Sequence, residues 1–333
     1  MKIVLLGAGR WGQNHLRVLR SLPVEVFVAD LNRQRLNDCR ALGVPDSHLS
    51  EDPRSFLAQA DAAVVVTPAQ SHFAICEEYL NSGKDVFVEK PMALSSLEAQ
   101  VLVELAGKNK CILQVGHIFR YNAVSRWLYE SIRQGKFGHI NMMKGNFSGF
   151  KRPRNDTGVA FAQAIHFVDL FNYFLGRGPA RVTAQLKDFL ERGMEDEALL
   201  TMEYASDAGL TWAKVESGYH APGKHREVLI IGTMLSAFCD FDLSPGKILL
   251  YHNQHVKEES GFKSLEGPAQ QLNFSIEEPL LTELRAFLNC VETRTQPLAN
   301  GHDGYESVRV LEAVMRSGKE GRSIELNDGG LKR

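Results

Sequence analysis

The chain has 333 residues, of which 44% are hydrophobic and 23% charged, with a formal net charge of −2. This length exceeds one ordinary hydrophobic core and predicts two domains. The near-neutral charge argues against nucleic-acid binding, and the lack of an apolar run of about 18 residues argues against a membrane span. Five scattered cysteines form no Cys/His cluster, and no signal peptide precedes the first strand, so we expect reduced thiols, no metal and a cytoplasmic protein.

The first thirty residues carry the most specific pattern. An apolar run at 2–6 precedes a glycine-rich turn, an amphipathic helix over 11–21 and a second apolar run over 24–29. In such a unit the first glycine permits the turn, the second lets the backbone approach a pyrophosphate, and the third lets helix pack on strand. A pyrophosphate is expected at the helix N-terminus. The predicted cofactor contacts here are Gly7, Gly9, Arg10, Trp11 and Gly12.

Asp30 ends the second strand, 18 residues after Gly12. A carboxylate at this place accepts hydrogen bonds from the adenosine ribose hydroxyls and repels a 2′-phosphate, so NAD is predicted over NADP. Two alternatives stay open. Asp30 is only a helix cap, or the nearby Arg33 meets a 2′-phosphate and NADP is also used.

The remaining elements up to residue 120 alternate in the same way. Strands are predicted at 62–66, 85–88 and 112–115, and helices at 31–42, 71–82 and 95–108. Continuous apolar strands separated by helices are typical of a doubly wound parallel sheet. Residues 1–120 are therefore predicted to form a Rossmann domain, with its ligand at the carboxyl ends of the strands.

Residues 121–333 follow a different pattern and are predicted to form a second α/β domain. Helices are expected at 122–134 and 161–174, around a strand at 140–150. Further strands are expected at 181–186, 198–204, 210–215, 228–231 and 248–251. No helical pattern separates them, which indicates an open, mainly antiparallel sheet. Helices at 279–293 and 303–317 are expected to pack on that sheet or back onto the first domain.

Two strand ends in the first domain carry candidate cofactor residues. Glu89-Lys90-Pro91 follows the strand at 85–88, where a lysine can donate a hydrogen bond to a substrate hydroxyl and Glu89 can orient it by ion pairing or by holding backbone donors. The alternative for Lys90 is a solvated surface charge. Thr67-Pro68 follows the strand at 62–66 and is expected beside the dinucleotide.

These motifs resemble the Gfo/Idh/MocA oxidoreductases, the relatives of glucose–fructose oxidoreductase and inositol dehydrogenase. The resemblance covers nearly the whole chain and also includes Gly116–Asn122 and the segment Ala164–Leu170. It implies a Rossmann domain, a C-terminal domain whose open sheet forms the oligomer interface, and oxidoreduction of pyranoses or polyols. His72 matches a family position beside the cofactor, although a helix-capping role is an equal alternative.

The resemblance also assigns two catalytic residues. Lys90 matches the family's catalytic lysine, and His166 matches the histidine that serves as general acid/base in many members. Many relatives have an aspartate or asparagine four residues before that histidine, where this chain has Ala162. Either His166 works without that partner, the neighbouring Gln163 replaces it, or the activity is modified. A core histidine bonded to the backbone is the alternative reading of His166.

The predicted substrate contacts are Arg120, Tyr121, Arg152, Gln163 and Asp169. Packing is the alternative for Arg120 and Tyr121, while Asp169 lies one helical turn after His166 and can pair with it. Arg152 belongs to the basic segment 151–156, which binds a diphosphate if the substrate is a sugar nucleotide, and is otherwise a solvated loop.

The sequence thus predicts an NAD(P)-dependent oxidoreductase that acts on a secondary hydroxyl or ketone of a sugar, sugar nucleotide or polyol. The alternatives are a ketoreductase of deoxysugar or polysaccharide biosynthesis and, in another class, a non-catalytic NAD-binding sensor. The family resemblance implies a homodimer or homotetramer formed through the C-terminal sheet.

Overall fold

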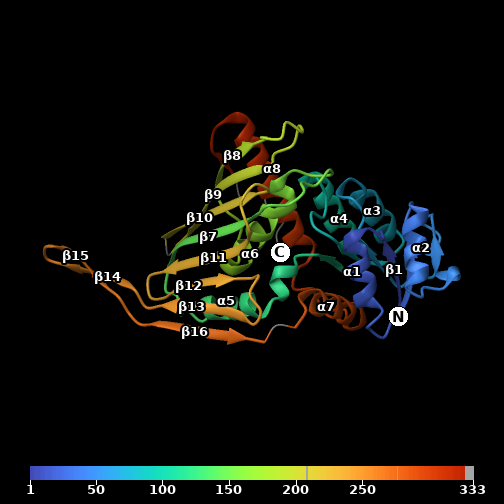
Figure 1. Ribbon diagram of the computed structural model, residues 1–333, viewed down its shortest axis with the longest axis horizontal. Helices are drawn as coiled ribbons and strands as arrows, with labels where there is room; N and C mark the ends of the chain where they lie inside the picture. Colours follow the sequence, from blue (N-terminus) through green and yellow to red (C-terminus); the bar gives the residue numbers. More distant parts are fainter. Residues whose placement is uncertain (208, 276, 327–333) are drawn as a thin grey trace. The chain divides into compact units, whose positions relative to one another are not determined.

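The computed structural model describes residues 1–207, 209–275 and 277–326 (Figure 1). Their contacts divide the chain into two compact units. Unit 1 holds residues 1–118 and 278–309, and unit 2 holds the described residues of 119–277 and 310–326. Among the described residues, no helix is both long enough and apolar enough to cross a membrane.

Unit 1 contains a parallel sheet of six strands in the order β3-β2-β1-β4-β5-β6. The strands are β1 (Lys2–Leu6), β2 (Glu25–Ala29), β3 (Leu49–Ser50), β4 (Ala62–Val65), β5 (Asp85–Val88) and β6 (Leu113–Val115). The doubly wound order confirms the predicted fold class. The sequence pattern missed β3 because two half-buried residues carry no periodicity.

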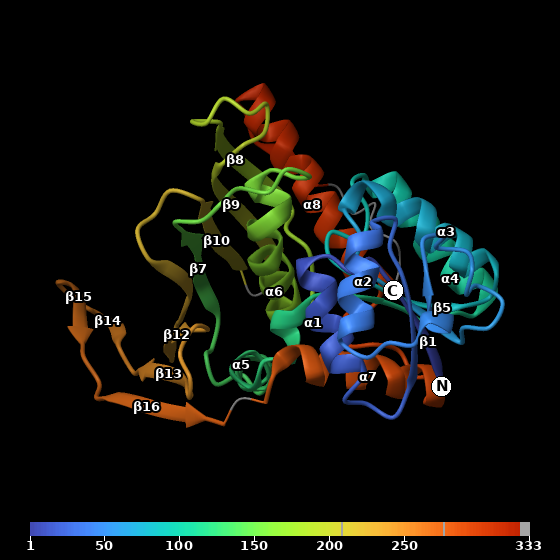
Figure 2. The same ribbon diagram turned by 45° about the vertical axis from the view of Figure 1, so that its right-hand side comes forward.

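Helices cover both faces of this sheet. They are α1 (Arg10–Leu19), α2 (Arg33–Ala41), α3 (His72–Asn81), α4 (Ser96–Asn109) and α7 (Pro279–Thr293). Apolar side chains of α1, α2 and α7 share one core with β1, β2, β4 and β5, in which Phe87 contacts Phe287 at 5.8 Å between ring centroids. The helices α3 and α4 pack side by side (Figure 2). Helix α7 is therefore part of unit 1, although it lies far along the sequence from the other helices of that unit.

Unit 2 is built on a nine-stranded sheet with the order β16-β13-β12-β11-β7-β10-β9-β8-β17. All neighbours are antiparallel except β7 and β10, which confirms the predicted mainly antiparallel sheet. The strands are β7 (Ile140–Gly149), β8 (Arg181–Lys187), β9 (Glu197–Ser206), β10 (Gly209–Gly218), β11 (Lys224–Gly232), β12 (Ser236–Asp240), β13 (Gly246–Tyr251), β16 (Ala269–Phe274) and β17 (Ile324–Glu325). The sequence analysis had not predicted β12, β16 or β17.

One face of this sheet carries the core of unit 2. Helices α5 (Ala123–Arg133), α6 (Ile165–Leu175) and the second half of α8 (Gly301–Glu320) pack there. Gly145 of β7 allows α6 to approach, since a Cβ at this position would lie 2.6 Å from the Phe167 ring. A hairpin of β14 (Gln254–Glu258) and β15 (Gly261–Leu265), also not predicted, extends beyond β13 and β16 with every residue exposed (Figures 1 and 2).

Candidate active site

The glycine turn between β1 and α1 is shaped for a close ligand. Gly7 has φ +96°, and a Cβ there would lie 2.8 Å from the carbonyl oxygen of Val66. A Cβ at Gly12 would lie 2.0 Å from the Gly7 oxygen. Helix α1 can therefore pack this closely on the turn after β1 only because residue 12 is a glycine. At Gly9, by contrast, the only atoms near a Cβ belong to the Arg35 guanidinium, at 3.7 Å or more. Gly9 provides no side-chain cap to α1, so backbone N–H groups at this helix start suit an anion.

Asp30 is fixed beside this turn. Its side chain accepts hydrogen bonds from the backbone N–H of Ala8 at 2.7 Å and of Asn32 at 2.8 Å. Asn32, not Asp30, caps α2, so the helix-cap alternative for Asp30 is wrong. The cation beside Asp30 is Arg35, whose Nη1 lies 3.3 Å from Oδ2. The sequence analysis had considered Arg33, but that exposed side chain lies near Glu51 instead.

Glu89 joins α1 to the end of β5. Its Oε1 accepts from Trp11 Nε1 at 2.7 Å and lies 2.9 Å from His15 Nε2, and its Oε2 accepts from the Lys90 backbone N–H at 3.2 Å. Burial by itself would raise the pKa of Glu89, but the bonds from His15 and Trp11 and the charge of Lys90 hold that pKa below its ordinary value. Glu89 is therefore an anion that holds backbone and side-chain donors. His15 was missed, and its signal was its place four residues after Trp11 on the inner face of α1.

His72 connects the two other predicted cofactor segments. Its Nδ1 lies 2.8 Å from the Pro91 carbonyl oxygen, and its Nε2 lies 2.8 Å from the Thr67 carbonyl oxygen. The ring bonds carbonyls rather than helix N–H groups, so the capping alternative for His72 is wrong. Thr67 in turn accepts a hydrogen bond from Ser71 at 2.7 Å, just after the turn set by Pro68. The strand ends after β4 and β5 are thus tied together through one buried side chain.

In unit 2, His166 is the second residue of α6 and is half-buried. Its ring stacks on Phe147 of β7, with centroids 5.0 Å apart, and lies 5.1 Å from the Phe119 ring. A π-helical turn over Ala160–Ala164 leads directly into α6. Such turns occur often at functional sites.

Gln163 lies in this π-helical turn and is 2% exposed. With its amide oriented to satisfy both neighbours, its nitrogen donates to the Phe147 carbonyl oxygen at 2.8 Å and its oxygen accepts from Lys151 Nζ at 3.3 Å. Gln163 therefore holds the loop after β7 against the helix that carries His166. Ala162 is buried and apolar.

Arg120 and Asp169 form a buried ion pair. The guanidinium donates from Nε at 2.9 Å and from Nη2 at 2.6 Å to the two carboxylate oxygens, and the side chains are 3% and 1% exposed. The Arg120 guanidinium also lies 4.8 Å from the Tyr173 ring centroid. With Tyr121 also buried, this geometry favours the packing alternative for Arg120 and Tyr121 over substrate contact, and Asp169 is the partner of Arg120.

The basic segment 151–156 divides into different environments. Arg154 bonds Asp156 at 2.7 Å, whereas Arg152 is exposed. Lys151 lies 5.5 Å from the Phe147 ring centroid and 5.7 Å from that of Tyr219. Lys151 thus connects this segment to Phe147, on which the His166 ring stacks.

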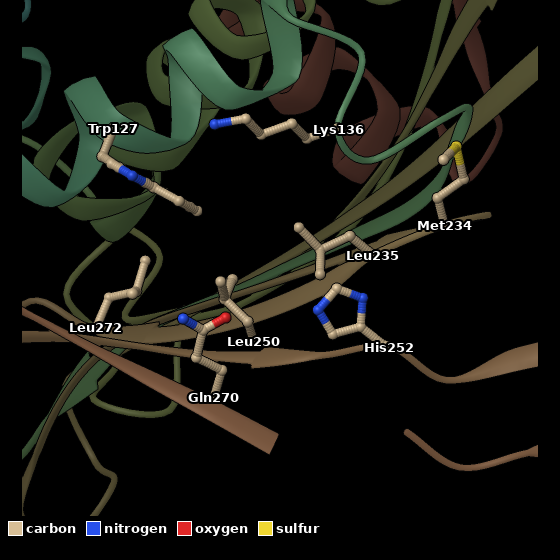
Figure 3. A pocket seen from close by; sticks show the side chains of 8 residues that line it. All are labelled: Trp127, Lys136, Met234, Leu235, Leu250, His252, Gln270 and Leu272. Carbon is tan, nitrogen blue, oxygen red and sulfur yellow. The ribbon is translucent and has the colours of Figure 1, made fainter. Parts of the chain in front are cut away.

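A cavity of about 510 Å³ in unit 2 does not include any predicted site residue. It opens between α5 and the edge of the sheet, and Figure 3 shows mostly apolar side chains around it. They are Trp127, Lys136, Met234, Leu235, Leu250, His252, Gln270 and Leu272. The described residues hold no group of three His, Cys, Asp or Glu side chains placed to bind a metal ion.

These features define a dinucleotide-binding α/β protein with a second unit built on a large open sheet. Residues 1–117 match the family model described as the NAD-binding Rossmann fold of the oxidoreductase family, and residues 129–326 match its C-terminal alpha/beta domain. The chain belongs to this family, the Gfo/Idh/MocA oxidoreductases. The predicted family, fold class and NAD-binding domain are therefore confirmed.

Named relatives extend over almost the entire chain. One is scyllo-inositol 2-dehydrogenase (NAD(+)) of Bacillus subtilis, 27% identical, with 98% of this chain and 96% of the relative covered. Another is UDP-N-acetylglucosamine 3-dehydrogenase of Acidithiobacillus ferrooxidans, 24% identical, with 95% and 96% covered. Among solved structures, GenD2 from gentamicin A biosynthesis in complex with NAD has a TM-score of 0.82 at 23% identity, with 98% and 96% covered.

Proposed function

We propose that the protein is an NAD-dependent dehydrogenase that acts on a secondary hydroxyl of a sugar, polyol or sugar nucleotide. The observation that carries this proposal is Glu89, which ties the helix of the glycine turn to the backbone of Lys90. A cofactor cradle and a candidate catalytic lysine are thereby held in one hydrogen-bonded unit. The inositol and sugar-nucleotide dehydrogenases among the relatives support the substrate class.

The proposed cofactor contacts follow from the geometry of unit 1. The N–H groups after Gly9 bind the pyrophosphate, and Asp30 accepts the ribose hydroxyls. Thr67, Pro68 and His72 shape the wall formed by the ends of β4 and β5. When bound, NAD supplies the acceptor for the hydride that leaves the substrate carbon.

Two side chains are proposed to act on the hydroxyl group of the substrate. Lys90 donates a hydrogen bond to the reacting oxygen and stabilises negative charge on it, and His166 accepts the hydroxyl proton. The stacking of His166 on Phe147 orients the plane of the imidazole. In the reverse direction the same groups serve a ketoreductase.

Ala162 favours a second candidate, a non-catalytic NAD-binding sensor. Family relatives with an acid at this position can orient the histidine by charge, and a buried methyl group cannot. The two candidates differ in turnover, since a sensor binds NAD and oxidises nothing.

A second copy of this chain is the proposed partner, bound through the face of the large sheet opposite α5 and α6. Half-buried apolar residues Leu229, Phe238 and Leu249 stand in register across β11, β12 and β13 on that face. A continuous apolar row on an open sheet indicates an interface. The proposed compartment is the cytoplasm, which the five free thiols support.

The experiment follows NADH formation with sugars, inositols, uronic acids and nucleotide sugars, each with NAD and with NADP. Lys90→Ala is expected to keep NAD binding and lower kcat by at least about 10²-fold. His166→Asn is expected to lower kcat and remove the limb of the pH–rate profile that an imidazole contributes near neutral pH.

The exposed Lys108→Ala and His255→Asn variants serve as controls and should behave like the wild type. Wild-type rates in Lys90→Ala would refute its catalytic role. Tight NAD binding without turnover on any compound would favour the sensor.

A further inference from the structure

Four cationic side chains gather in unit 2 where β7 ends and β11 begins: Lys151, Arg154, Lys224 and Arg226. The two strands are neighbours in the sheet (Figure 1). The register pairs Arg226 with Phe147, so both side chains project from the same face. That face is the one on which α6 packs.

Phe147 connects these cations to the proposed catalytic histidine. The Arg226 guanidinium carbon lies 3.7 Å from the Phe147 ring centroid, and Lys151 Nζ lies 5.5 Å from it. The His166 ring stacks on the same phenyl group at 5.0 Å. Gln163, three residues before His166, accepts a hydrogen bond from Lys151 Nζ. The imidazole and both cations therefore gather around one phenyl ring.

Two of the four cations already have a carboxylate. Arg154 forms an ion pair with Asp156, and Lys224 forms one with Asp242. The positive charges of Arg154 and Lys224 are therefore already balanced in part by carboxylates of the protein.

Lys151 and Arg226 differ in this respect, because the described part of the chain offers neither of them an ion pair. Arg226 donates hydrogen bonds to the carbonyl oxygens of Ser148, at 3.1 Å, and His225, at 2.5 Å. Lys151 has the neutral Gln163 amide. The carboxylates of Asp240 and Asp242 attract Arg226, and Asp242 attracts Lys151, without forming a direct ion pair with either. The repulsion between the two neighbouring cations is therefore only partly offset in the protein alone, and a bound anion would offset it further.

The lowered pKa of Lys151 agrees with the gathering of positive charges around it. Partial desolvation and then repulsion from Arg226, Lys224 and Arg154 lower the pKa of Lys151 to about 8, and Asp242 offsets this only in part. A bound anion would oppose the repulsion and favour the ammonium form. Lys151 is exposed, so a ligand can reach it.

We infer that Lys151 and Arg226 bind a negatively charged substituent, a carboxylate or a phosphate, on the sugar whose hydroxyl faces His166. The inference rests on the proposed function, because it assigns the substrate class of that same site. A guanidinium presents paired N–H donors that match either anion, and the ammonium adds a point charge beside it. Arg226 was missed in the sequence because a single arginine in a strand carries no motif. Arg152, predicted as a substrate contact, is replaced in this role by its neighbour Lys151.

The first experiment compares substrates that differ only by an anion. Initial rates with NAD are measured for D-glucose, D-glucuronate and D-glucose 6-phosphate, and for N-acetylglucosamine against UDP-N-acetylglucosamine. We expect kcat/KM for at least one anionic member to exceed that of its neutral counterpart by about 10- to 100-fold, the range of one charge-assisted hydrogen bond. A preference for glucuronate identifies a carboxylate, and a preference for the phosphorylated compounds identifies a phosphate.

Variants then locate the effect. Lys151→Met and Arg226→Met are each expected to raise KM for the preferred anionic compound about 10- to 100-fold more than they raise KM for its neutral counterpart. Arg226→Lys should recover part of the loss. Arg133→Met removes a charge from the exposed end of α5 and is the matched control. Because Arg226 packs on Phe147, thermal unfolding is measured for each variant, and the exposed Lys151 provides the test that does not depend on packing.

Calorimetric binding of the same compounds to the NAD-loaded His166→Asn protein separates this inference from the proposed function. Anion binding that disappears in the additional Lys151→Met variant supports the site even if no compound is oxidised, and then only the dehydrogenase proposal fails. Oxidation of neutral and anionic sugars at equal kcat/KM, unaffected by Lys151→Met and Arg226→Met, would overturn the inference and leave the dehydrogenase intact. Absence of binding for all the anionic compounds would also overturn it.

Discussion

Replacing Glu89 with glutamine tests whether this carboxylate holds the cofactor unit together. Glutamine keeps the size of the side chain, but it removes the charge that strengthens the bonds from Trp11 and His15. Its amide nitrogen would also face the Lys90 N–H, where two donors meet. Hydrogen bonds to charged groups contribute about 1.5 to 3 kcal/mol each. Trp11 is 43% exposed, so water can replace part of its bond.

We therefore expect Glu89→Gln to lower the free energy of unfolding by about 2 to 4 kcal/mol. For a chain of this size the loss corresponds to a fall in Tm of about 3 to 6 °C. The assay is thermal unfolding followed by circular dichroism, with KM for NAD measured in parallel and expected to rise. Glu104→Gln on the exposed face of α4 is the control and should change stability by less than about 0.5 kcal/mol.

The pH dependence of this difference has a defined sign. Because the pKa of Glu89 lies below its ordinary value in the folded protein, its contribution is present above the unfolded pKa and is lost as pH falls through the folded pKa. The gap between wild type and Glu89→Gln should therefore narrow below about pH 4.5. A Tm within about 1 °C of the wild type at pH 7, or a gap that widens in acid, would refute the reasoning.

Three further changes test the cofactor turn and the anion site. Asp30→Ser should weaken NAD about tenfold and NADP less, because the ribose loses a charged acceptor while Arg35 remains; an unchanged NAD-to-NADP ratio of dissociation constants would contradict this. Gly12→Ala should cost about 1 to 3 kcal/mol in urea unfolding and weaken NAD, since its Cβ would lie 2.0 Å from a backbone oxygen. Gly107→Ala, with open space at its Cβ, should instead stabilise by about 0.5 to 1 kcal/mol, and equal effects of the two would argue against steric control. KM for the preferred anionic sugar should rise as pH passes about 8, because Lys151 loses its charge there, and a flat KM from pH 7 to 9 would exclude that role.

The local elements of this chain could be predicted because their patterns span neighbouring residues. The five apolar runs of unit 1, the glycine turn and the long helix α7 all appear where their periodicity placed them. The residues of the cofactor turn could be named for the same reason, because Gly7, Gly9 and Gly12 act through the backbone of one short segment. The exposed strands β14 and β15 escaped prediction because no buried face imposes alternation on them.

Pairings between distant residues depended on the tertiary structure. The sequence indicated that Asp169 lies one helical turn from His166. In the folded chain Asp169 forms a buried ion pair with Arg120, which is 49 residues away in the sequence. Arg226 meets Phe147 only because β11 and β7 lie next to each other with a defined register.

The difference between what the sequence determined and what the tertiary structure decided has a physical reason. Periodicity and turn chemistry are short-range properties, so the sequence by itself determined the Rossmann elements and the residues of the glycine turn. The family resemblance of its motifs indicated Lys90 and His166 as candidate catalytic residues. Which buried charge pairs with which, and which cations remain without a carboxylate, depends on sheet register and helix packing. The tertiary structure therefore decided that Glu89 joins α1 to the end of β5, that Arg120 and Asp169 form a buried ion pair, and that Lys151 and Arg226 lie against the same phenyl ring as His166.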